Sequence, residues 1–504
     1  MKSSNSIVNG VNPTLEMNKA RGQKLGRLAA LLGLTLVAGC TISPNYQRPT
    51  PLGENPIPAT FGDPAIANST AWKTAQPAAG LPRGNWWELY GDPELNRLES
   101  LTASENQQLA VALANFTQAR AAAKISEADV FPQATGAATA TRQRTSANTT
   151  AKTSNTFNTF NLTANASWEV DLWGRVHQEI AGAQARLTAS ADDLESLRLS
   201  LQAEVAIDYF TLRALDAQAE LLDKTIASYQ QALEVTTNRR NNGVASELDV
   251  SQAETQLKSA QAQVPVLDLQ RGQLRHALAV LCGQVATSFA VAPSTAEATN
   301  PPEIPIAIPS ELLESRPDIA AAERRMAAAN ADIGLAKAAY YPKVQLIGTA
   351  GLESISTSNL FDLPSRLWAL GPSLQVPIFN GGKNQAQLNA SKAAYDGTVA
   401  TYRQTVLAAF QEVEDQLATQ LLLSRQLDEE EAALKAAQHT LDISTNRYQA
   451  GVGQYLDVIS AQATQLTHRQ RTVQLGWQRL SASVSLIKSL GSGWNNADKT
   501  PKNN

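Results

Sequence analysis

The chain has 504 residues, more than one ordinary compact domain contains, so it forms either several domains or one elongated architecture. Aromatic residues make up 6% and charged residues 17%, while Ala, Gln, Leu, Ser and Thr dominate, which favours long helices packed through small side chains. The formal net charge of -4 comes without a basic stripe, and this argues against nucleic acid as a partner.

The first predicted element is a secretory signal over residues 1–39. Basic residues precede an apolar stretch over 25–39, and small residues lead to Cys40, which is the order of a signal peptide. Counting from Met17 gives a signal of normal length, so Met17 is a candidate for the true start. Residues 37–40 resemble a lipobox, in which the Cys40 thiol takes a diacylglycerol and the new N-terminus an acyl chain. The alternative is cleavage elsewhere, with Cys40 discarded.

Residues 40–84 are rich in Pro and small polar side chains, and they are expected to form a lipidated, extended tether. The segment 285–313 is Pro-rich as well, and 492–504 is expected to be a flexible tail. If Cys40 is acylated, Cys282 has no partner and the fold does not depend on a disulfide. Cys282 is therefore expected to be a small buried apolar residue.

The chain between these segments repeats itself. Residues 242–250 recur as 450–458, Phe131-Pro132 recurs as Tyr341-Pro342, and 167–173 recurs as 373–379. The matches keep their order and nearly the same offset, so the chain contains a duplicated unit of helix, β-hairpin, long helix, turn and helix. The first repeat is predicted over 85–284 and the second over 314–491.

Each repeat contains one predicted β-hairpin, over about 133–173 and about 342–379. From Phe160 to Leu172 every even position is apolar and every odd one polar, which predicts a two-faced strand. No later segment has the uninterrupted apolar run of about 18 residues that a spanning helix needs, so closed strands are expected to cross the bilayer. Four strands cannot close a barrel, whose smallest known type has about eight, but three copies would supply twelve. The alternative is a soluble β-sandwich fragment.

Helical periodicity follows each hairpin, and long helical hairpins are predicted over about 174–284 and about 380–491. A helix from about 174 to 241 would be about 100 Å long. Pro265 is expected to bend the second helix of the first hairpin. An ordinary coiled coil would not explain why β-hairpins are inserted at matching places.

Several motifs carry a resemblance to a known family. They are Trp86-Trp87, Gly91-Asp92-Pro93-Glu94-Leu95, Asn106, Leu109 and Ala119-Arg120-Ala121 in the first half, and Arg316-Pro317-Asp318-Ile319, Ala336, Tyr341-Pro342 and Gly348 in the second. The chain resembles the outer-membrane factor family of tripartite efflux systems, in its OprM/NodT-like lipoprotein branch, with TolC-like members more distant. The resemblance implies an α+β fold, in which the duplicated unit gives a four-stranded contribution to a trimeric 12-stranded transmembrane β-barrel and helices to a long periplasmic α-helical barrel.

The resemblance also assigns the two repeated turns. It implies that adaptor-docking helix turns contain Gly243, Val244, Leu248, Val250, Gly451, Val452, Leu456 and Val458, and that Asp249, Asp457 and Tyr448 form the gate of a periplasmic aperture. Ser460 stands where TolC-like members carry a second aperture aspartate, and Gly453 where they carry a latch arginine. The alternative for both aspartates is capping of the following helix.

The resemblance implies a passive trimeric exit duct for drugs or toxic compounds, anchored by lipid and integral in the outer membrane, with a large periplasmic portion. Its implied partners are two further copies, a periplasmic membrane-fusion adaptor, an inner-membrane pump of the resistance-nodulation-division type and outer-membrane lipid. A channel for type I protein secretion and a non-channel periplasmic coiled-coil scaffold are the alternatives.

An enzyme is not expected. The four histidines, His177, His276, His439 and His468, lie far apart without metal-ligand spacing, and no nucleophile or phosphate motif occurs. Each is expected to be a solvated helix residue. Neither a metal nor a cofactor beyond the lipid on Cys40 is predicted. The acidic run 428–431 is expected to be a solvated helix face.

Overall fold

The computed structural model describes residues 46–53, 56–58, 85–148, 154–292, 298–302, 304 and 315–491. The predicted signal, Cys40 and the predicted tail lie outside the described residues. The chain divides into two compact units. The sheet unit consists mainly of Ala121–Ala185 and Ala327–Asp396, and the helical unit contains Arg48–Arg120, Arg186–Met326 and the chain from Gly397 onward.

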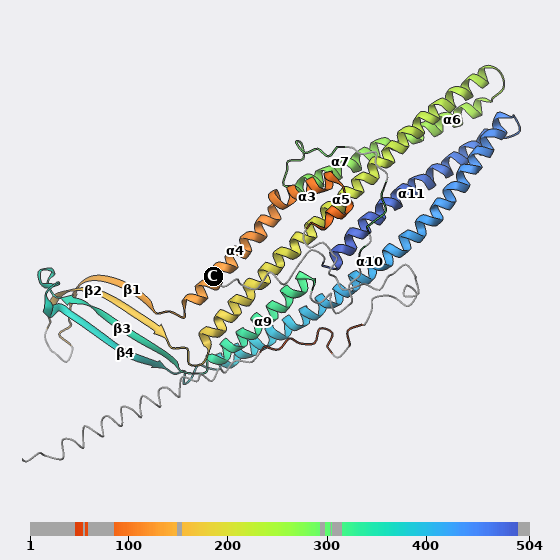
Figure 1. Cartoon of the computed structure of the whole chain (residues 1–504). Helices are drawn as coiled ribbons and strands as arrows, with labels where there is room; N and C mark the ends of the chain where they lie inside the picture. Colours follow the sequence, from red (N-terminus) through yellow and green to blue (C-terminus); the bar gives the residue numbers. More distant parts are fainter. Residues whose placement is uncertain are drawn as a thin grey trace, which may run out of the picture. The chain divides into compact units, whose positions relative to one another are not determined.

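Four antiparallel strands form one sheet in the order β1-β2-β3-β4 (Figure 1). The strands are β1 (Gln133–Arg144), β2 (Thr156–Glu169), β3 (Lys343–Ser354) and β4 (Arg366–Gln375). Trp168 of β2 lies opposite Leu346 of β3, and Val344 lies opposite Leu374 of β4. β1 and β4 each have one neighbour, so one edge of each carries no strand among the described residues.

The predicted strand through Leu172 is three residues too long, because the backbone leaves the sheet after Glu169. The Leu172 amide donates to the Val170 carbonyl at 2.9 Å, and the Asp171 carboxylate accepts from the His177 amide at 2.9 Å. Asp171 therefore caps the start of the next helix. The backbone conformation that this cap requires is incompatible with continuing the strand. In the second hairpin Pro377, which has no amide hydrogen, follows the end of β4.

The helices carry most of the chain. They are α3 (Pro93–Glu105), α4 (Gln107–Ala128), α5 (Arg175–Asn241), α6 (Glu247–Gln261), α7 (Val264–Leu281), α9 (Pro317–Ala338), α10 (Lys383–Gln449) and α11 (Tyr455–Ser489), with a 3₁₀ helix η1 (Trp86–Tyr90). α5 and α10 have 67 residues each, which confirms a helix of about 100 Å from near residue 174 to 241. None of the helices in the described ranges is both long and apolar enough to span a membrane.

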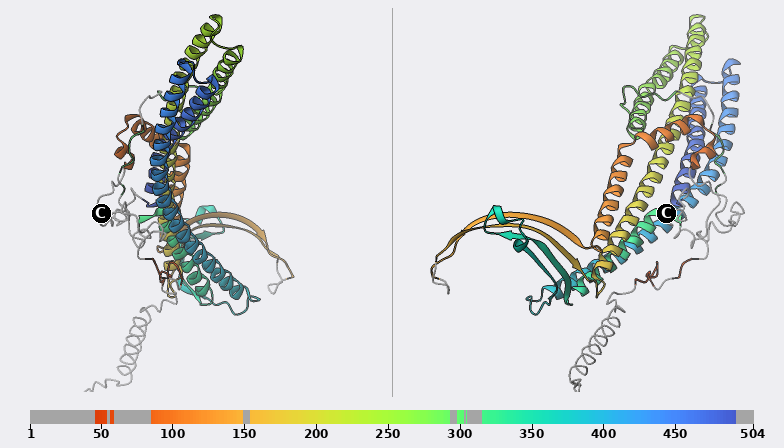
Figure 2. Two further views of the ribbon diagram at one scale, coloured as in Figure 1. Left: turned by 90° about the vertical axis from the view of Figure 1, so that its right-hand side faces the viewer. Right: turned by 60° about the vertical axis from the view of Figure 1, so that its left-hand side comes forward.

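Pro265 marks a difference between the two repeats. α6 ends at Gln261, and α7 begins at Val264 with Pro265 in its first turn, because proline is tolerated there but breaks a helix interior. The equivalent helix α11 continues unbroken for 35 residues. Figures 1 and 2 show α6 lying alongside the end of α5, and α11 alongside α10.

The core of the helical unit contains residues from both repeats. The long helix α5 contributes Val205, Tyr209 and Leu212, and α11 contributes Trp477 and Leu480, all at most 7% exposed. Burying a large apolar side chain contributes about 1.5–3 kcal/mol, so this cluster holds the two repeats together. Cys282 belongs to it and is fully buried, which confirms that prediction.

α7 and α11 end in equivalent joints. Gly283 and Gly491 follow them with φ of +65° and +68°. A Cβ on Gly283 would lie 2.2 Å from the Glu105 carbonyl oxygen, and one on Gly491 would lie 2.4 Å from that of Ser315. Each glycine therefore allows a close backbone approach that a side chain would prevent.

Side chains strengthen the two joints. Asn106 Nδ2 donates to the Leu281 carbonyl at 2.7 Å, and an Arg316 guanidinium nitrogen donates to the Ser489 carbonyl at 2.9 Å. Both residues stand directly before the helix that leads back to the sheet, α4 or α9. The duplicated motif is thus also a duplicated joint, in which Asn in one repeat replaces Arg in the other.

Three charged side chains, of which Arg213 and Asp216 are buried, link α5 to α7. Asp216 Oδ2 lies 3.1 Å from Arg213 Nη1, and Asp216 Oδ1 lies 2.7 Å from Arg271 Nη2. The side chains of Arg213 and Asp216 are each 4% exposed. Arg213 Nη1 also donates to the Ala292 carbonyl at 2.6 Å, which fixes the start of the segment between the repeats. Two guanidinium groups therefore depend on one buried carboxylate.

Glu99 of α3 is fully buried, and neither of its carboxyl oxygens has a hydrogen-bond partner. Burial raises the pKa of Glu99 well above its ordinary value of 4.5. The folded protein then retains a proton that the unfolded chain releases above about pH 4.5, so stability falls as pH rises beyond that value.

We expect Glu99→Gln to stabilise the protein by about 1–2 kcal/mol at pH 7 and to have almost no effect at pH 4. The unfolding midpoint in urea, followed by circular dichroism at both pH values, measures this. The exposed Glu127→Gln serves as control and should change neither midpoint. A Glu99→Gln effect that is equal at the two pH values would contradict a buried, protonated carboxyl.

Candidate functional site

The two repeated turns have the same backbone hydrogen bonds. The Gly243 amide donates to the Arg240 carbonyl and the Val244 amide to that of Arg239, both at 2.8 Å. The Gly451 amide likewise donates to Tyr448 at 3.1 Å and the Val452 amide to Arg447 at 3.0 Å. This pair of bonds is a Schellman motif, which needs a left-handed residue, and the two glycines have φ of +75° and +78°.

Each turn is followed by a capping box. The Ser246 amide donates to Asp249 Oδ2 at 3.0 Å, while the Asp249 amide donates to Ser246 Oγ at 3.2 Å. The Gln454 amide donates to Asp457 Oδ2 at 3.4 Å. Both aspartates therefore lie three residues into α6 and α11, where a negative charge also meets the positive end of the helix dipole. The capping alternative is confirmed in a modified form, because Ser246 and Gln454 occupy the cap itself.

Apolar side chains project from both turns. Val244 and Leu248 are each 65% exposed, and Val452 and Leu456 are 70% and 50% exposed. Figures 1 and 2 show both turns at the same end of the helical unit. We call these four residues the turn-tip residues.

The side chain of Val458, in one of the two predicted docking turns, is not exposed on the single chain. Val458 is 4% exposed because it packs with Ala253 and Tyr455 in a cluster between α6 and α11. Val250 is half-buried. These two valines face the inside of the helix pairs, because each lies two residues after an exposed leucine, Leu248 or Leu456, and two residues rotate a helix by about half a turn.

Tyr448 is the centre of a contact between the two helical hairpins. Its ring centroid lies 5.0 Å from that of Tyr455, and the Arg239 guanidinium carbon lies 4.8 Å from the Tyr448 ring centroid. Arg239 belongs to α5, so the cation–π contact joins the first repeat to the second. Burial raises the pKa of Tyr455, whose hydroxyl bonds to Thr236 of α5. We call Arg239, Thr236, Tyr448 and Tyr455 the hairpin clasp.

Three of the four clasp residues, Arg239, Thr236 and Tyr455, were not predicted from the sequence. TolC-like members carry a latch arginine at the position of Gly453. In this chain Arg239, from the other hairpin, places its guanidinium over the Tyr448 ring. The only sequence signal is that Arg239 and Tyr448 both lie in the last turn before a repeated glycine. Because the clasp joins helices about 200 residues apart, no local pattern could pair them.

The histidines give no metal site. Among the residues that the structure describes, no group of three or more His, Cys, Asp or Glu side chains could hold a metal ion. His177, His276 and His439 are exposed, as predicted. His468 is not a solvated residue, because α10 and α11 pack together and bring His468 Nδ1 within 2.6 Å of Glu430 Oε1, with both side chains largely buried.

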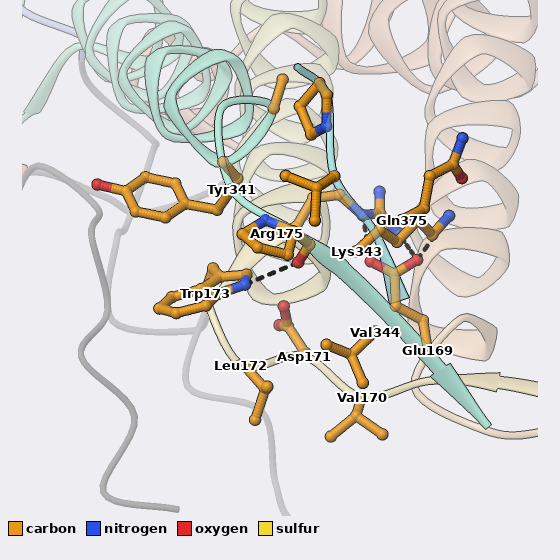
Figure 3. A pocket seen from close by; sticks show the side chains of 15 residues that line it. Glu169, Val170, Asp171, Leu172, Trp173, Arg175, Tyr341, Lys343, Val344 and Gln375 are labelled. Atoms are coloured by element: carbon orange, nitrogen blue, oxygen red, sulfur yellow. Dashed lines mark hydrogen bonds and ion pairs between the residues drawn. The ribbon is translucent and has the colours of Figure 1, made fainter. Parts of the chain in front are cut away.

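A cavity of about 270 Å³ lies in the sheet unit, where β2 and β3 meet the start of α5 (Figure 3). Glu169 accepts from Arg175 at 2.7 and 3.1 Å and pairs with Lys343 at 2.8 Å. Trp173 Nε1 donates to the Pro342 carbonyl at 2.8 Å. Because each of these polar groups already has a partner within the cavity wall, the cavity is a joint between sheet and helix and is poorly suited to binding a ligand.

Comparisons with known proteins cover nearly the whole chain. A sequence model of the family described as "Outer membrane efflux protein" matches residues 98–284 and 308–492. The "Probable efflux pump outer membrane protein TtgC" of Pseudomonas putida is 32% identical over 472 residues, 92% of this chain and 96% of the relative. The "Outer membrane protein OprJ" of Pseudomonas aeruginosa is 33% identical over 478 residues, 94% and 97% of the two chains.

A solved structure, described as that of the outer-membrane channel OprN, superposes with a TM-score of 0.82. It is 30% identical to this chain and covers 90% of it, and all of its own length is matched. The outer membrane protein VceC of Vibrio cholerae gives a TM-score of 0.77 at 29% identity, with 82% of this chain and all of VceC covered.

Proposed function

The chain belongs to the outer membrane efflux protein family, and from this membership we propose that it is a passive trimeric exit duct for small molecules. At the level of family, efflux function and outer-membrane location, the prediction from the sequence is confirmed. The family consists of channels and not of enzymes. Relatives at 32% identity include an "Antibiotic efflux pump outer membrane protein" and a "Toluene efflux pump outer membrane protein" of Pseudomonas putida, which supports small apolar or amphipathic cargo over secreted proteins.

Three copies are proposed to close one barrel of twelve strands, with the helices of the two repeats, 85–284 and 314–491, forming an α-helical barrel. The open edges of β1 and β4 support this, because unpaired strand edges are not tolerated in a bilayer. Apolar side chains on β4 also support it, since Trp368, Leu370 and Leu374 are 80%, 69% and 65% exposed on the single chain. They would face outer-membrane lipid.

A lipid on Cys40 is proposed to anchor the N-terminus, with residues 40–84 as tether. One described part of this tether supports the arrangement. The Arg48 guanidinium donates to the Tyr402 hydroxyl of α10 at 3.1 and 3.2 Å, and it lies 3.9 Å from Glu323. A tether fixed to the helices about eight residues after the lipid would hold the subunit close to the membrane surface.

Asp249, Asp457 and Tyr448 are proposed to form the periplasmic aperture. Three copies would bring three copies of each carboxylate towards one axis and create a negative ring that attracts cations. The hairpin clasp supports a gating role, because it is one of the contacts near the turns that must break or slide if the two hairpins move apart. The turn-tip residues are proposed to bind the hairpin tips of a periplasmic adaptor, and an inner-membrane pump of the resistance-nodulation-division type is proposed to supply the energy.

The charge ring is tested by Asp457→Asn in planar bilayers. Asparagine can still accept from the Gln454 amide, so the variant removes charge and keeps the helix start. At 10 Å in water each carboxylate attracts a cation by about 0.4 kcal/mol, so three together raise its local concentration by up to about sevenfold. We expect the cation-to-anion permeability ratio to fall by a comparable factor.

Asp428→Asn, on an exposed face of α10, is the matched control and should leave the permeability ratio unchanged. Unchanged selectivity and conductance in Asp457→Asn would remove the gate assignment. A purified wild-type protein that stays monomeric and never conducts would overturn the channel itself and favour a scaffold.

A further inference from the structure

Two equivalent loops lead from the sheet to the two longest helices. Residues 170–174 connect β2 to α5, and residues 376–382 connect β4 to α10. Both loops end in a glycine with positive φ, Gly174 at +76° and Gly382 at +85°. In the repeated sequence Ser167–Trp173 and Ser373–Phe379, the aromatic residues Trp173 and Phe379 occupy the same place. The two aromatic residues are therefore expected to have the same kind of partner.

Trp173 has its partner within the chain. Its ring centroid lies 5.1 Å from that of Tyr341, and its Nε1 donates to the Pro342 carbonyl (Figure 3). Tyr341 and Pro342 directly precede β3, the neighbour of β2. In this arrangement, an aromatic side chain that follows one strand packs on an aromatic-proline pair that precedes the neighbouring strand. We call it the aromatic seat.

Phe379 has no such partner in the described part of its own chain. Phe379 is 90% exposed, and Ile378 beside it is 94% exposed. Two adjacent large apolar side chains that are both almost fully exposed mark a contact surface.

A second aromatic-proline pair is also unoccupied. Phe131 and Pro132 precede β1 as Tyr341 and Pro342 precede β3, and Phe131 is 68% exposed. The local backbone is the same, because the Phe131 amide donates to the Ala128 carbonyl at 3.1 Å and the Tyr341 amide to the Ala338 carbonyl at 3.0 Å. The chain thus carries one complete aromatic seat and the two halves of another.

The two halves cannot be joined within one chain by the same strand pairing, because they belong to β4 and β1 at opposite edges of the sheet. The complete seat forms because β2 and β3 are antiparallel neighbours, with Glu169 opposite Gln345, so the loop after one strand reaches the residues before the other. If β4 of one copy pairs in the same way with β1 of another, its loop reaches Phe131 and Pro132 of that copy.

We propose that Phe379 of each subunit packs on Phe131 and Pro132 of the partner subunit, and that this intersubunit aromatic seat sets the register of the closing strands. The inference rests on the proposed trimer and identifies the contact that locks it. Each half-seat is incomplete without a second copy of the chain.

The charges at the two seats differ. The complete seat is surrounded by the ion pairs of Glu169 with Arg175 and Lys343. In the other seat, Gln375 at the end of β4, Lys383 at the start of α10 and Gln133 at the start of β1 take the places of Glu169, Arg175 and Lys343. None of these three is a carboxylate. The intersubunit seat therefore depends on apolar contact, and trimer dissociation should respond little to salt through this contact.

The test is the double variant Phe131→Cys/Phe379→Cys in the full-length protein, oxidised in detergent. Cys282 is buried and does not interfere. We expect reductant-sensitive dimers and trimers on denaturing gels, and none from either single variant. Phe131→Cys/Ile355→Cys is the matched control, because Ile355 is 72% exposed but lies beyond the far end of β3. It should not form cross-links.

Lysine-directed cross-linking of the same samples separates two kinds of failure. Trimers without a disulfide between positions 131 and 379 in the Phe131→Cys/Phe379→Cys variant, or with as much disulfide in the Phe131→Cys/Ile355→Cys control, would overturn the aromatic seat and leave the proposed duct intact. The absence of trimers in both assays would overturn the duct as well.

Phe379→Ala provides a second measurement that needs no cross-link. The trimer should dissociate at a temperature several degrees lower, while the helical circular dichroism signal of the subunit stays unchanged, and Phe379→Trp should restore the wild-type temperature. A dissociation temperature unaffected by Phe379→Ala would overturn the proposal.

Discussion

Replacing Asp216 with alanine should destabilise the helical unit by about 3–5 kcal/mol, because the change leaves two arginines without their shared buried counter-ion. Arg213 and Asp216 are each 4% exposed, and Arg271 is 18% exposed. Water cannot readily replace the carboxylate at this depth. Removing it should also loosen α7 and the segment near Ala292, whose carbonyl accepts from Arg213.

The loss is measured as the urea midpoint of helix unfolding in detergent. Asp268→Ala removes the other carboxylate that contacts Arg271, at 3.2 Å, but Asp268 is 60% exposed. An exposed pair contributes less than about 1 kcal/mol, so this control should be nearly neutral. Equal effects of the two substitutions would show that the buried carboxylate has no special role.

Gly283→Ala should cost about 2–5 kcal/mol, the sum of left-handed backbone strain and overpacking. The new Cβ would lie 2.2 Å from the Glu105 carbonyl oxygen, a backbone atom that cannot rotate away. α7 would then separate from the junction of α3 and α4. Gly491→Ala should have a similar effect on α11, because its Cβ would lie 2.4 Å from the Ser315 carbonyl oxygen.

Gly91→Ala measures the cost of left-handed backbone strain without the cost of overpacking. Gly91 has φ of +63°, but a Cβ there would meet no atom within 4 Å among the described residues, so alanine should cost only about 1–2 kcal/mol. The thermal unfolding midpoints of the three variants compare the two contributions directly. A Gly283→Ala midpoint no lower than that of Gly91→Ala would mean that the close approach to Glu105 relaxes without cost.

Local sequence patterns were sufficient for the elements themselves. The alternation from Phe160 onward predicted β2, and the repeated Gly-Val sequences predicted where α5 and α10 end, because strand and helix periods are properties of neighbouring residues. The boundary at Glu169 was missed, since it depends on a carboxylate two residues later that caps a helix.

Contacts between distant segments were beyond such patterns. The Asp216 ion pairs, the hairpin clasp at Tyr448 and the pairing of His468 with Glu430 each join different helices, so their residues look like ordinary solvated positions in the sequence. The turn glycines and aspartates were found because the repeat places them twice. The burial of the Val458 side chain was not foreseen, because matching positions in a repeat do not reveal which way each side chain faces.

The two uncovered strand edges have a consequence for the life of a newly made subunit. If the proposed trimer forms, a subunit that has not yet met its partners has one edge of β1 and one of β4 without a neighbouring strand among the described residues, and such edges are a template for uncontrolled aggregation. Biogenesis should therefore depend on a periplasmic chaperone, and the yield of mature protein should rise more steeply than linearly with expression. Orphan copies that arrive too late should be removed by proteolysis.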